Sequence, residues 1–168
     1  MTTTIHHGDC VDILPTLAPG SVQTIVTSPP YLGLRDYGIA PTAWPAIEYA
    51  PMPGVPSITV PAQVVCLGLE ADPAAYVAHL VHVFRLARPA LREDSTCWLN
   101  LGDSYAGHNN GYSGDDRPSN KAGAMSAKHN GQRSMSQRST VGNGLKNKDL
   151  MLIPARVALA LQADGWYV

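Results

Sequence analysis

The chain has 168 residues, of which 45% are apolar and 15% are charged, and its formal net charge is −1. These proportions are those of an ordinary globular domain, and they exclude a chain that is disordered throughout. No apolar run approaches the roughly 20 residues of a membrane span, and the amino terminus lacks the basic start and apolar core of an export signal, so we expect a cytoplasmic protein.

The first 28 residues predict a strand, a short helical turn and a second strand. TTTIHHGD is a β-prone run that ends at Gly8-Asp9, and CVDILPTLAPGS is a brief helical turn that closes at Pro19-Gly20. VQTIVTS, over residues 22–28, is rich in β-branched residues and is predicted to be a buried strand.

A proline-rich stretch comes next, with prolines recurring from Pro41 to Pro61. Proline lacks the backbone donor that a helix needs and clashes with the preceding helical turn, so no long helix fits here. We therefore predict a proline-rich insertion over residues 40–62 that makes an irregular excursion from the core.

A long helix is predicted to begin at Asp72, which would cap it, with Pro73 in the first helical position. A third core strand is predicted over residues 95–103, STCWLNLGD. The order strand, helix, strand with right-handed crossovers predicts an α/β fold with a parallel sheet. The apolar residues at helical spacing that support the helix are Val77, Leu80, Val81, Phe84 and Leu91.

Residues 104–148 are rich in Gly, Ser, Asn, Gln and basic side chains, and we predict a flexible loop there. Because the rest of the chain is acidic, this asymmetry predicts contact with phosphates; a solvated loop with incidental lysines is the alternative. A last helix is predicted from Ile153-Pro154 to a cap at Gly165, and residues 166–168 are predicted to enter another strand. The basic residues of the loop are Arg117, Lys121, Lys128, Arg133, Arg138, Lys146 and Lys148.

Three predicted strand ends carry polar residues, namely Gly8-Asp9, Ser28-Pro29-Pro30-Tyr31 and Gly102-Asp103. Ligands of parallel α/β sheets gather at the carboxyl ends of the strands. We therefore expect these three ends to face one crevice.

The second of these ends has a chemical logic for an amino-group substrate. Pro29 and Pro30 have a fixed φ and hold the carbonyls of Ser28 and Pro29 in set directions, and the Ser28 hydroxyl adds a further acceptor. Acceptors at fixed positions would favour the pyramidal, more nucleophilic form of an exocyclic amine. Tyr31 supplies a flat face for an extruded base. The alternative is that this tetrapeptide is a rigid turn and nothing more.

Four runs of the sequence resemble the amino-methylating DNA methyltransferases of bacteria and their phages. They are GDCVDIL, SVQTIVTSPPYLGLRDYG, LARPALREDSTCWLNLGDSYAG and KDLMLIPARVALALQADGWYV, and they are similar to the permuted subclass in which the catalytic half comes first. The resemblance implies a partial, Rossmann-like parallel-sheet fold that depends on S-adenosylmethionine. It also implies methyl transfer to an exocyclic amine of a flipped base in double-stranded DNA, with cytosine N4 slightly favoured over adenine N6.

The resemblance assigns roles to individual residues. Ser28, Pro29, Pro30 and Tyr31 match the catalytic motif of the family. Asp9, together with its neighbour Cys10, matches the position that contacts the adenosine part of the cofactor, although Asp9 could instead cap a helix. Gly102 and Asp103 match the end of the next core strand, where a structural role is an equal alternative.

The family's aromatic-x-Gly-x-Gly cofactor loop and its target-recognition region have no counterpart in this sequence. We therefore expect residues 1–168 to be the catalytic half of a methyltransferase domain. One hypothesis is an active DNA methyltransferase, as a homodimer or with a complementing carboxyl-terminal polypeptide, that serves restriction-modification, regulation or phage self-protection. The other is a truncated, catalytically silent remnant or DNA-binding module.

Two other chemistries are not supported by the cysteines and histidines. A C5-cytosine methyltransferase uses a thiolate that typically follows proline, and none of Cys10, Cys66 and Cys97 does so. A deaminase would need a zinc site made from a histidine and paired cysteines beside a glutamate. No such spacing occurs, and we expect no metal centre.

Overall fold

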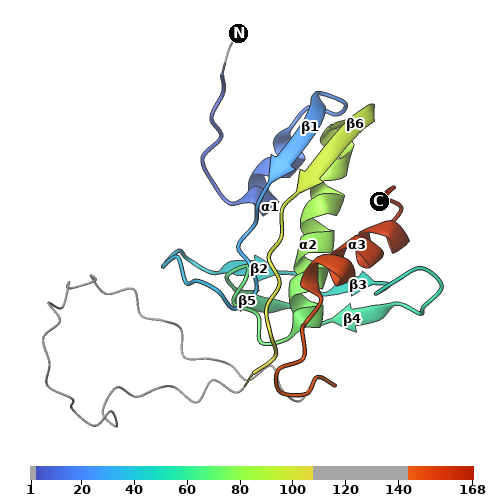
Figure 1. Cartoon of the computed structure of the whole chain (residues 1–168). Coiled ribbons are helices and arrows are strands. Elements are labelled where there is room, and N and C mark those ends of the chain that lie inside the picture. Colours follow the sequence, from blue (N-terminus) through green and yellow to red (C-terminus); the bar gives the residue numbers. More distant parts are fainter. Residues whose placement is uncertain (1–2, 108–143) are drawn as a thin grey trace, which may run out of the picture.

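Two parallel strands backed by a long helix frame the structure, a computed structural model that describes residues 3–107 and 144–168. Strand β1 (Val22–Thr27) pairs with β6 (Leu91–Leu99) in parallel, and the register runs from Thr24 opposite Thr96 to Thr27 opposite Leu99. Helix α2 (Pro73–Ala87) lies along one side of this pair (Figure 1). The predicted α/β class with a parallel strand pair is confirmed.

The amino-terminal strand prediction is wrong. Residues 3–8 form no strand, and the Ile5 side chain is 88% exposed, because among the described residues no strand lies beside this run to supply hydrogen-bond partners. The helical turn that follows is confirmed as α1 (Cys10–Ile13) and the 3₁₀ turn η1 (Leu14–Thr16).

The proline-rich stretch contains no helix, as predicted, but it is more regular than expected. It holds four short strands, paired antiparallel as β2 (Thr42–Trp44) with β5 (Gln63–Val65) and β3 (Ile47–Tyr49) with β4 (Ile58–Val60). The prolines stand outside these strands, where their missing N–H costs no ladder bond. The prediction of an excursion from the core is also wrong, because these strands carry buried side chains that pack against α2, including Trp44, Ile47, Tyr49 and Val60.

Helix α2 is the centre of the hydrophobic core. It begins as predicted, because the Asp72 side chain accepts a hydrogen bond from the Ala74 N–H and Pro73 occupies the first turn. It ends at Ala87 in a 3₁₀ turn, η2 (Arg88–Ala90), whose Pro89 cannot continue the α-helix. Leu91, which was assigned to the helical face, therefore begins β6.

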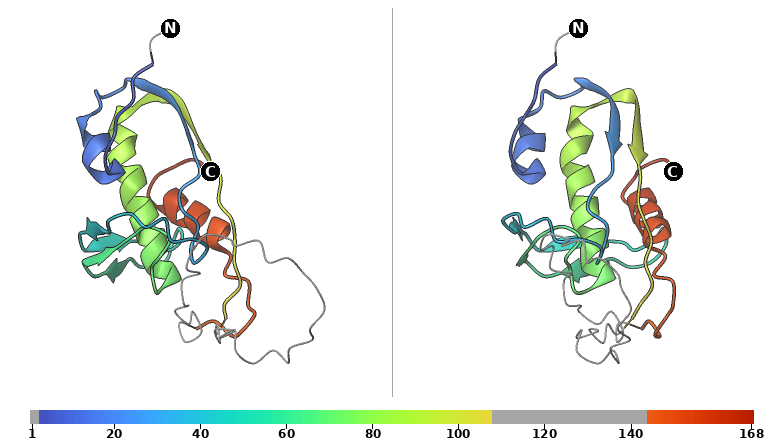
Figure 2. Two further views of the ribbon diagram at one scale, coloured as in Figure 1. Left: turned by 90° about the vertical axis from the view of Figure 1, so that its left-hand side faces the viewer. Right: turned by 60° about the vertical axis from the view of Figure 1, so that its left-hand side comes forward.

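The strand pair is buried on one face only. Side chains of Ile25, Cys97 and Leu99 are half-buried on the side of α2, whereas Val26 and its register partner Trp98 are 78% and 66% exposed. The prediction of a strand at residues 22–28 is thus correct, but the prediction that this strand is buried is wrong. The reason is that no described element covers the outer face of β1 and β6 (Figure 2).

Helix α3 (Ile153–Ala163) packs beside α2 and buries Ile153, Val157, Ala160 and Leu161. Residues 166–168 form no strand; instead, the Trp166 ring meets Phe84 edge-on with the ring centroids 5.9 Å apart. Across residues 3–107 and 144–168, none of the helices combines the length and the apolar character that crossing a membrane requires.

Candidate functional site

The Ser28–Tyr31 turn leaves β1 at its carboxyl end. The last rung beside it is the hydrogen bond that the Asn100 N–H donates to the Thr27 carbonyl, at 2.9 Å. Pro29 and Pro30 then end the ladder, because neither has an N–H to donate. The Ser28 side chain is exposed, and its hydroxyl donates to the Tyr31 hydroxyl oxygen at 3.2 Å.

Helix α2 holds this turn from behind. The Tyr76 hydroxyl, on a fully buried side chain, donates to the Pro30 carbonyl at 2.9 Å. Burial, with a smaller effect of the Glu70 carboxylate, raises the pKa of Tyr76, so this hydroxyl keeps its proton and remains a donor. Within the described part of the chain no donor reaches the Pro29 carbonyl, which leaves that oxygen available to a substrate amine.

Two glycines let the backbone come close to the turn. A Cβ on Gly68, which has a φ of +90°, would lie 2.9 Å from the Tyr31 carbonyl oxygen and 3.1 Å from the Pro30 Cβ. A Cβ on Gly102 would lie 2.6 Å from Cδ2 of the Tyr31 ring. The Gly33 N–H also donates to the Gly68 carbonyl at 2.8 Å. The turn therefore lies between two backbone segments that approach it closely. A residue larger than glycine at position 68 or 102 would force the turn to shift.

A buried polar network supports the Gly68 segment. Glu70 Oε2 accepts from the Gly68 N–H at 2.8 Å, and Glu70 Oε1 lies 2.7 Å from Nδ1 of His79, with both side chains fully buried. The Gln63 amide nitrogen lies 3.2 Å from His79 Nε2, and since an amide N–H₂ can only donate, Nδ1 carries the imidazole proton that Glu70 accepts. The Trp44 ring stacks on His79 with centroids 4.1 Å apart.

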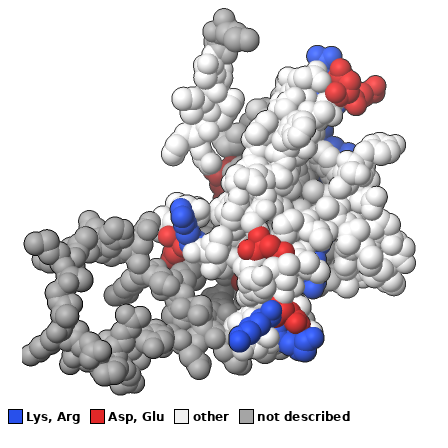
Figure 3. All heavy atoms as spheres, in the orientation of Figure 1, with Lys and Arg blue, Asp and Glu red and all other residues white. Residues whose placement is uncertain are grey.

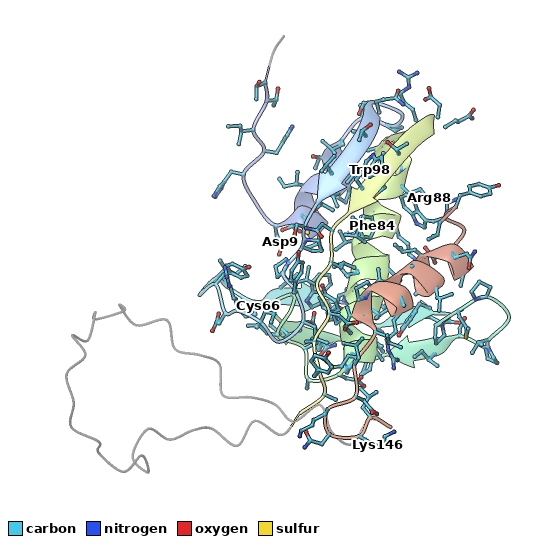
Figure 4. The ribbon with its side chains drawn as sticks, in the orientation of Figure 1. Asp9, Cys66, Phe84, Arg88, Trp98 and Lys146 are labelled. Atoms are coloured by element: carbon cyan, nitrogen blue, oxygen red, sulfur yellow. The ribbon has the colours of Figure 1, made fainter. Side chains whose placement is uncertain are left out.

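Asp9 caps a helix and retains capacity for a ligand. Its Oδ1 accepts from the Val11 N–H at 3.1 Å and its Oδ2 accepts from the Thr42 hydroxyl at 2.6 Å, so the helix-cap alternative describes its contacts. The side chain is half-buried between the start of α1 and Thr42 of β2, and each carboxylate oxygen has a second lone pair for an amino or hydroxyl group (Figure 4). Cys10 beside it is exposed.

Of the three predicted strand ends, the structure brings two together. Gly102 follows β6 and meets the Tyr31 ring, as expected of neighbouring parallel strands. Asp103 has a structural role, because its Oδ1 accepts from the Ser104 N–H at 2.8 Å and from the Ile153 N–H at 3.1 Å, at the start of α3. Gly8-Asp9 is not a strand end, because no strand precedes it.

Two of the seven predicted phosphate-binding residues lie among the described residues. Lys146 and Lys148 are exposed, and the Lys146 ammonium lies 3.5 Å from the Asp149 carboxylate (Figure 4). The other five, Arg117, Lys121, Lys128, Arg133 and Arg138, lie outside the described residues.

In the part of the chain that the structure describes, the cysteine thiols are not activated as nucleophiles and no cluster of metal ligands is found. Burial is the largest cause that raises the pKa of each thiol, which disfavours the reactive thiolate at Cys10, Cys66 and Cys97. No three His, Cys, Asp or Glu side chains among residues 3–107 and 144–168 come together as metal ligands.

The supports of the turn were missed by the sequence predictions. Tyr76 lies 46 positions from Pro30 and His79 lies nine positions from Glu70, whereas Glu70 is only two positions from Gly68. No local pattern marks these three side chains. One signal was present, since a tyrosine and a histidine on the apolar face of a predicted helix need polar partners when buried.

The chain is similar to several curated Type II methyltransferases over nearly its whole length. It is 38% identical over 165 residues to M.Cfr9I of Citrobacter freundii, a match that covers 98% of this chain and 43% of the relative. It is also 38% identical over 166 residues to M.XycI of Xanthomonas campestris pv. cyanopsidis, covering 99% and 44%. M.SmaI of Serratia marcescens is 35% identical over 161 residues, covering 96% and 43%.

The chain thus spans less than half the length of these relatives. No family model matches the chain, and no solved structure matches it.

Proposed function

This chain is a homologue of part of the Type II methyltransferases, and on that premise we propose that it forms the catalytic portion of a DNA amino-methyltransferase. The reaction would transfer a methyl group to an exocyclic amine of a flipped base, with cytosine N4 favoured over adenine N6. Restriction-modification is the role that the names of the relatives support.

The observation that carries the proposal is the braced turn at the carboxyl end of β1. Its Pro30 carbonyl is held by Tyr76, which fixes the neighbouring Pro29 carbonyl at the strand end. A rigid turn alone would not require the Gly68 and Gly102 contacts that keep Tyr31 in place. Preorganised acceptors of this kind stabilise positive charge as it develops on an amine nitrogen.

Each residue of the turn has a proposed task. The Pro29 carbonyl and the exposed Ser28 hydroxyl accept the two amine hydrogens and orient the nitrogen lone pair toward the methyl donor. The half-buried Tyr31 ring, backed by Gly102, stacks on the flipped base. No covalent enzyme intermediate is needed for this direct transfer, in keeping with the raised thiol pKa values.

The methyl donor in this proposal is S-adenosylmethionine, which supplies an electrophilic methyl group on sulfur. Asp9, with its remaining lone pairs at the start of α1, would hold the adenosine part together with Cys10. The basic residues from Arg117 to Lys148 would contact the phosphates of double-stranded DNA, with no sequence preference of their own.

The test is nucleoside mass spectrometry on DNA from a methylation-free host that expresses the chain. We expect N4-methylcytosine, and a loss on the order of 10²-fold in the Ser28→Ala variant, because one oriented acceptor is removed. The matched control is Ser21→Ala, since Ser21 is an exposed serine before the same strand whose hydroxyl donates to the Ala18 carbonyl.

The outcomes separate the parts of the proposal. N6-methyladenine in place of N4-methylcytosine would keep the site and change the base. Methylation that survives both Ser28→Ala and Tyr31→Ala would show that the site assignment is wrong.

A second candidate function follows from the coverage of the relatives. Because more than half of each of the three relatives lies outside the matched segment, the chain could be catalytically silent on its own, as a remnant or DNA-binding module. Absence of both methylated bases, with DNA binding retained in a gel-shift assay, would favour this candidate.

A further inference from the structure

A buried charge lies behind the Ser28–Tyr31 turn. On the face shown in Figure 3, acidic and basic side chains lie at the surface, where water solvates them. Glu70 is the only buried carboxylate among residues 3–107 and 144–168, at 5% exposure, and His79, which contacts it, is at 0%. An apolar pair of similar volume often serves stability as well or better, so stability alone does not account for this pair.

Tyr76 and His79 project from the same face of α2. They are three positions apart, which makes them neighbours on the helix surface, and both side chains are fully buried. Tyr76 donates directly to the Pro30 carbonyl at 2.9 Å. His79 acts through Glu70, which lies 2.7 Å from its Nδ1 and accepts the Gly68 N–H at 2.8 Å. The helix therefore fixes one carbonyl of the turn directly and fixes Gly68 through Glu70.

Gly68 connects this hydrogen bond to the turn. Its carbonyl accepts the Gly33 N–H at 2.8 Å, two residues after the turn ends. Its Cα approaches the Tyr31 carbonyl so closely that an added Cβ would lie 2.9 Å from that oxygen. Both polar groups of this residue are thus engaged, the N–H by Glu70 and the carbonyl by Gly33. Because the contacts are close, a shift of Glu70 would displace Gly68 and, with it, the backbone of the turn.

The proline-rich strands fix His79 from its other side. Gln63, the first residue of β5, places its amide nitrogen 3.2 Å from Nε2 of His79, which keeps the imidazole proton on Nδ1. Trp44 of β2 stacks on the ring, and its indole N–H donates to the Val65 carbonyl at 2.9 Å. A flip of the ring or a change of tautomer would break the bond to Glu70. Strands β2 and β5 are therefore connected to the turn through one imidazole.

We propose that His79 is a positioning residue for methyl transfer, and that the proline-rich strands contribute to catalysis through it. This proposal rests on the proposed function of the turn. Gln63 holds the Nδ1–H tautomer, this tautomer orients Glu70, and Glu70 sets the position of Gly68. His79 acts only through the backbone that carries the Pro29 carbonyl. Because a displacement of about 1 Å can lower a rate by about 10²-fold, such a support affects turnover more than binding.

The first test measures the turn itself, by amide hydrogen exchange and nuclear magnetic resonance in the purified 168-residue chain. The reporter is the Gly33 amide, which donates to Gly68, and the reference is the Val81 amide inside α2. His79→Leu should accelerate exchange at Gly33 about tenfold more than at Val81. His79→Asn should restore most of the protection, because its amide N–H₂ can take the place of Nδ1–H.

The matched control is His82→Leu. His82 lies three positions further along α2 and meets the edge of the same Trp44 ring, with the centroids 6.4 Å apart. In this variant, exchange at Gly33 and Val81 should change equally. Equal acceleration of the two amides in His79→Leu would show that His79 only stabilises the fold, and would overturn the proposal.

The ¹⁵N resonances of the imidazole test the tautomer separately. We expect the proton on Nδ1 of His79 in the unsubstituted chain, and a loss of this preference in Gln63→Leu, which removes the donor to Nε2. A proton on Nε2, or on both nitrogens, in the unsubstituted chain would overturn the role given to Gln63.

The kinetic test uses the complete or complemented enzyme. His79→Leu should lower kcat about tenfold and leave KM for DNA within about twofold, and His79→Asn should recover most of kcat. Equal kcat values in His79→Leu and His82→Leu would overturn the proposal. If the unsubstituted enzyme methylates no DNA while exchange at Gly33 responds as expected, the proposed function fails and the support of the turn by His79 stands.

Discussion

The carboxyl end of the β1–β6 pair and its outer face differ in how far other residues support them. At the carboxyl end, the Ser28–Tyr31 turn has a hydrogen bond from Tyr76 and close backbone contacts from Gly68 and Gly102. On the outer face, Val26 and Trp98 are exposed, and within residues 3–107 and 144–168 no strand pairs with the second edge of β6. The comparison teaches that the supports of the Ser28–Tyr31 turn lie within the described residues, whereas those residues supply no cover for the outer face of β1 and β6.

The largest expected effect comes from removing the buried carboxylate behind the turn. Glu70→Ala leaves the Gly68 N–H and the His79 Nδ1–H without acceptors in a fully buried site. At about 1–3 kcal/mol for each unsatisfied donor, with the lost packing, the free energy of unfolding should fall by about 3–5 kcal/mol. Urea denaturation followed by circular dichroism measures this.

The control for this variant is Glu93→Ala, because Glu93 is an exposed carboxylate on β6. Its effect should stay within about 0.5 kcal/mol. Equal losses in the two variants would show that the Glu70 network does not support the turn.

A smaller effect is expected from a methyl group placed under the turn. Gly68→Ala combines a φ of +90° with a Cβ 2.9 Å from the Tyr31 carbonyl oxygen, whereas Gly54 has a φ of +79° and nothing within 4 Å of an added Cβ. Gly68→Ala should therefore cost about 2–3 kcal/mol and Gly54→Ala about 1 kcal/mol. Thermal unfolding of both variants measures the difference, and equal shifts would mean that contact with the turn contributes nothing.

These supports show where prediction from the sequence stops. The turn itself was predictable, because β-branched residues, two prolines and a tyrosine follow one another within ten positions, and the Asp72-Pro73 helix start is equally local. The supports come from contacts between residues far apart in the sequence, such as Tyr76 with Pro30 and Gly102 with Tyr31.

The burial of the strand at residues 22–28 was also predicted wrongly, again because it depends on residues far away in the sequence. VQTIVTS has the composition of a buried strand, but burial depends on what lies over it, and the described residues leave Val26 uncovered. The short strands at residues 42–65 were missed because each has only three residues and prolines stand between them, so no alternating pattern is long enough to indicate a strand.

Removing one hydroxyl should separate positioning from stability. Tyr76→Phe loses the bond to the Pro30 carbonyl, and Tyr49→Phe loses a comparable bond to the Ala74 carbonyl that does not touch the turn. Each should lower the free energy of unfolding by about 1 kcal/mol. If Tyr76 positions the turn, only Tyr76→Phe should also lower the rate of methylation by the complete or complemented enzyme at saturating substrate, and equal rates in the two variants would refute that role.

The smallest effect is expected on the uncovered face, where it tests the comparison most directly. Trp98→Ser replaces a side chain that is 66% exposed, so unfolding free energy should change by no more than about 0.5 kcal/mol. Trp44→Ser, at 3% exposure and stacked on His79, should cost about 3–5 kcal/mol. A loss above about 2 kcal/mol for Trp98→Ser would mean that this face is covered within the chain itself. The difference between the two variants follows because a side chain contributes to stability only where folding removes it from water.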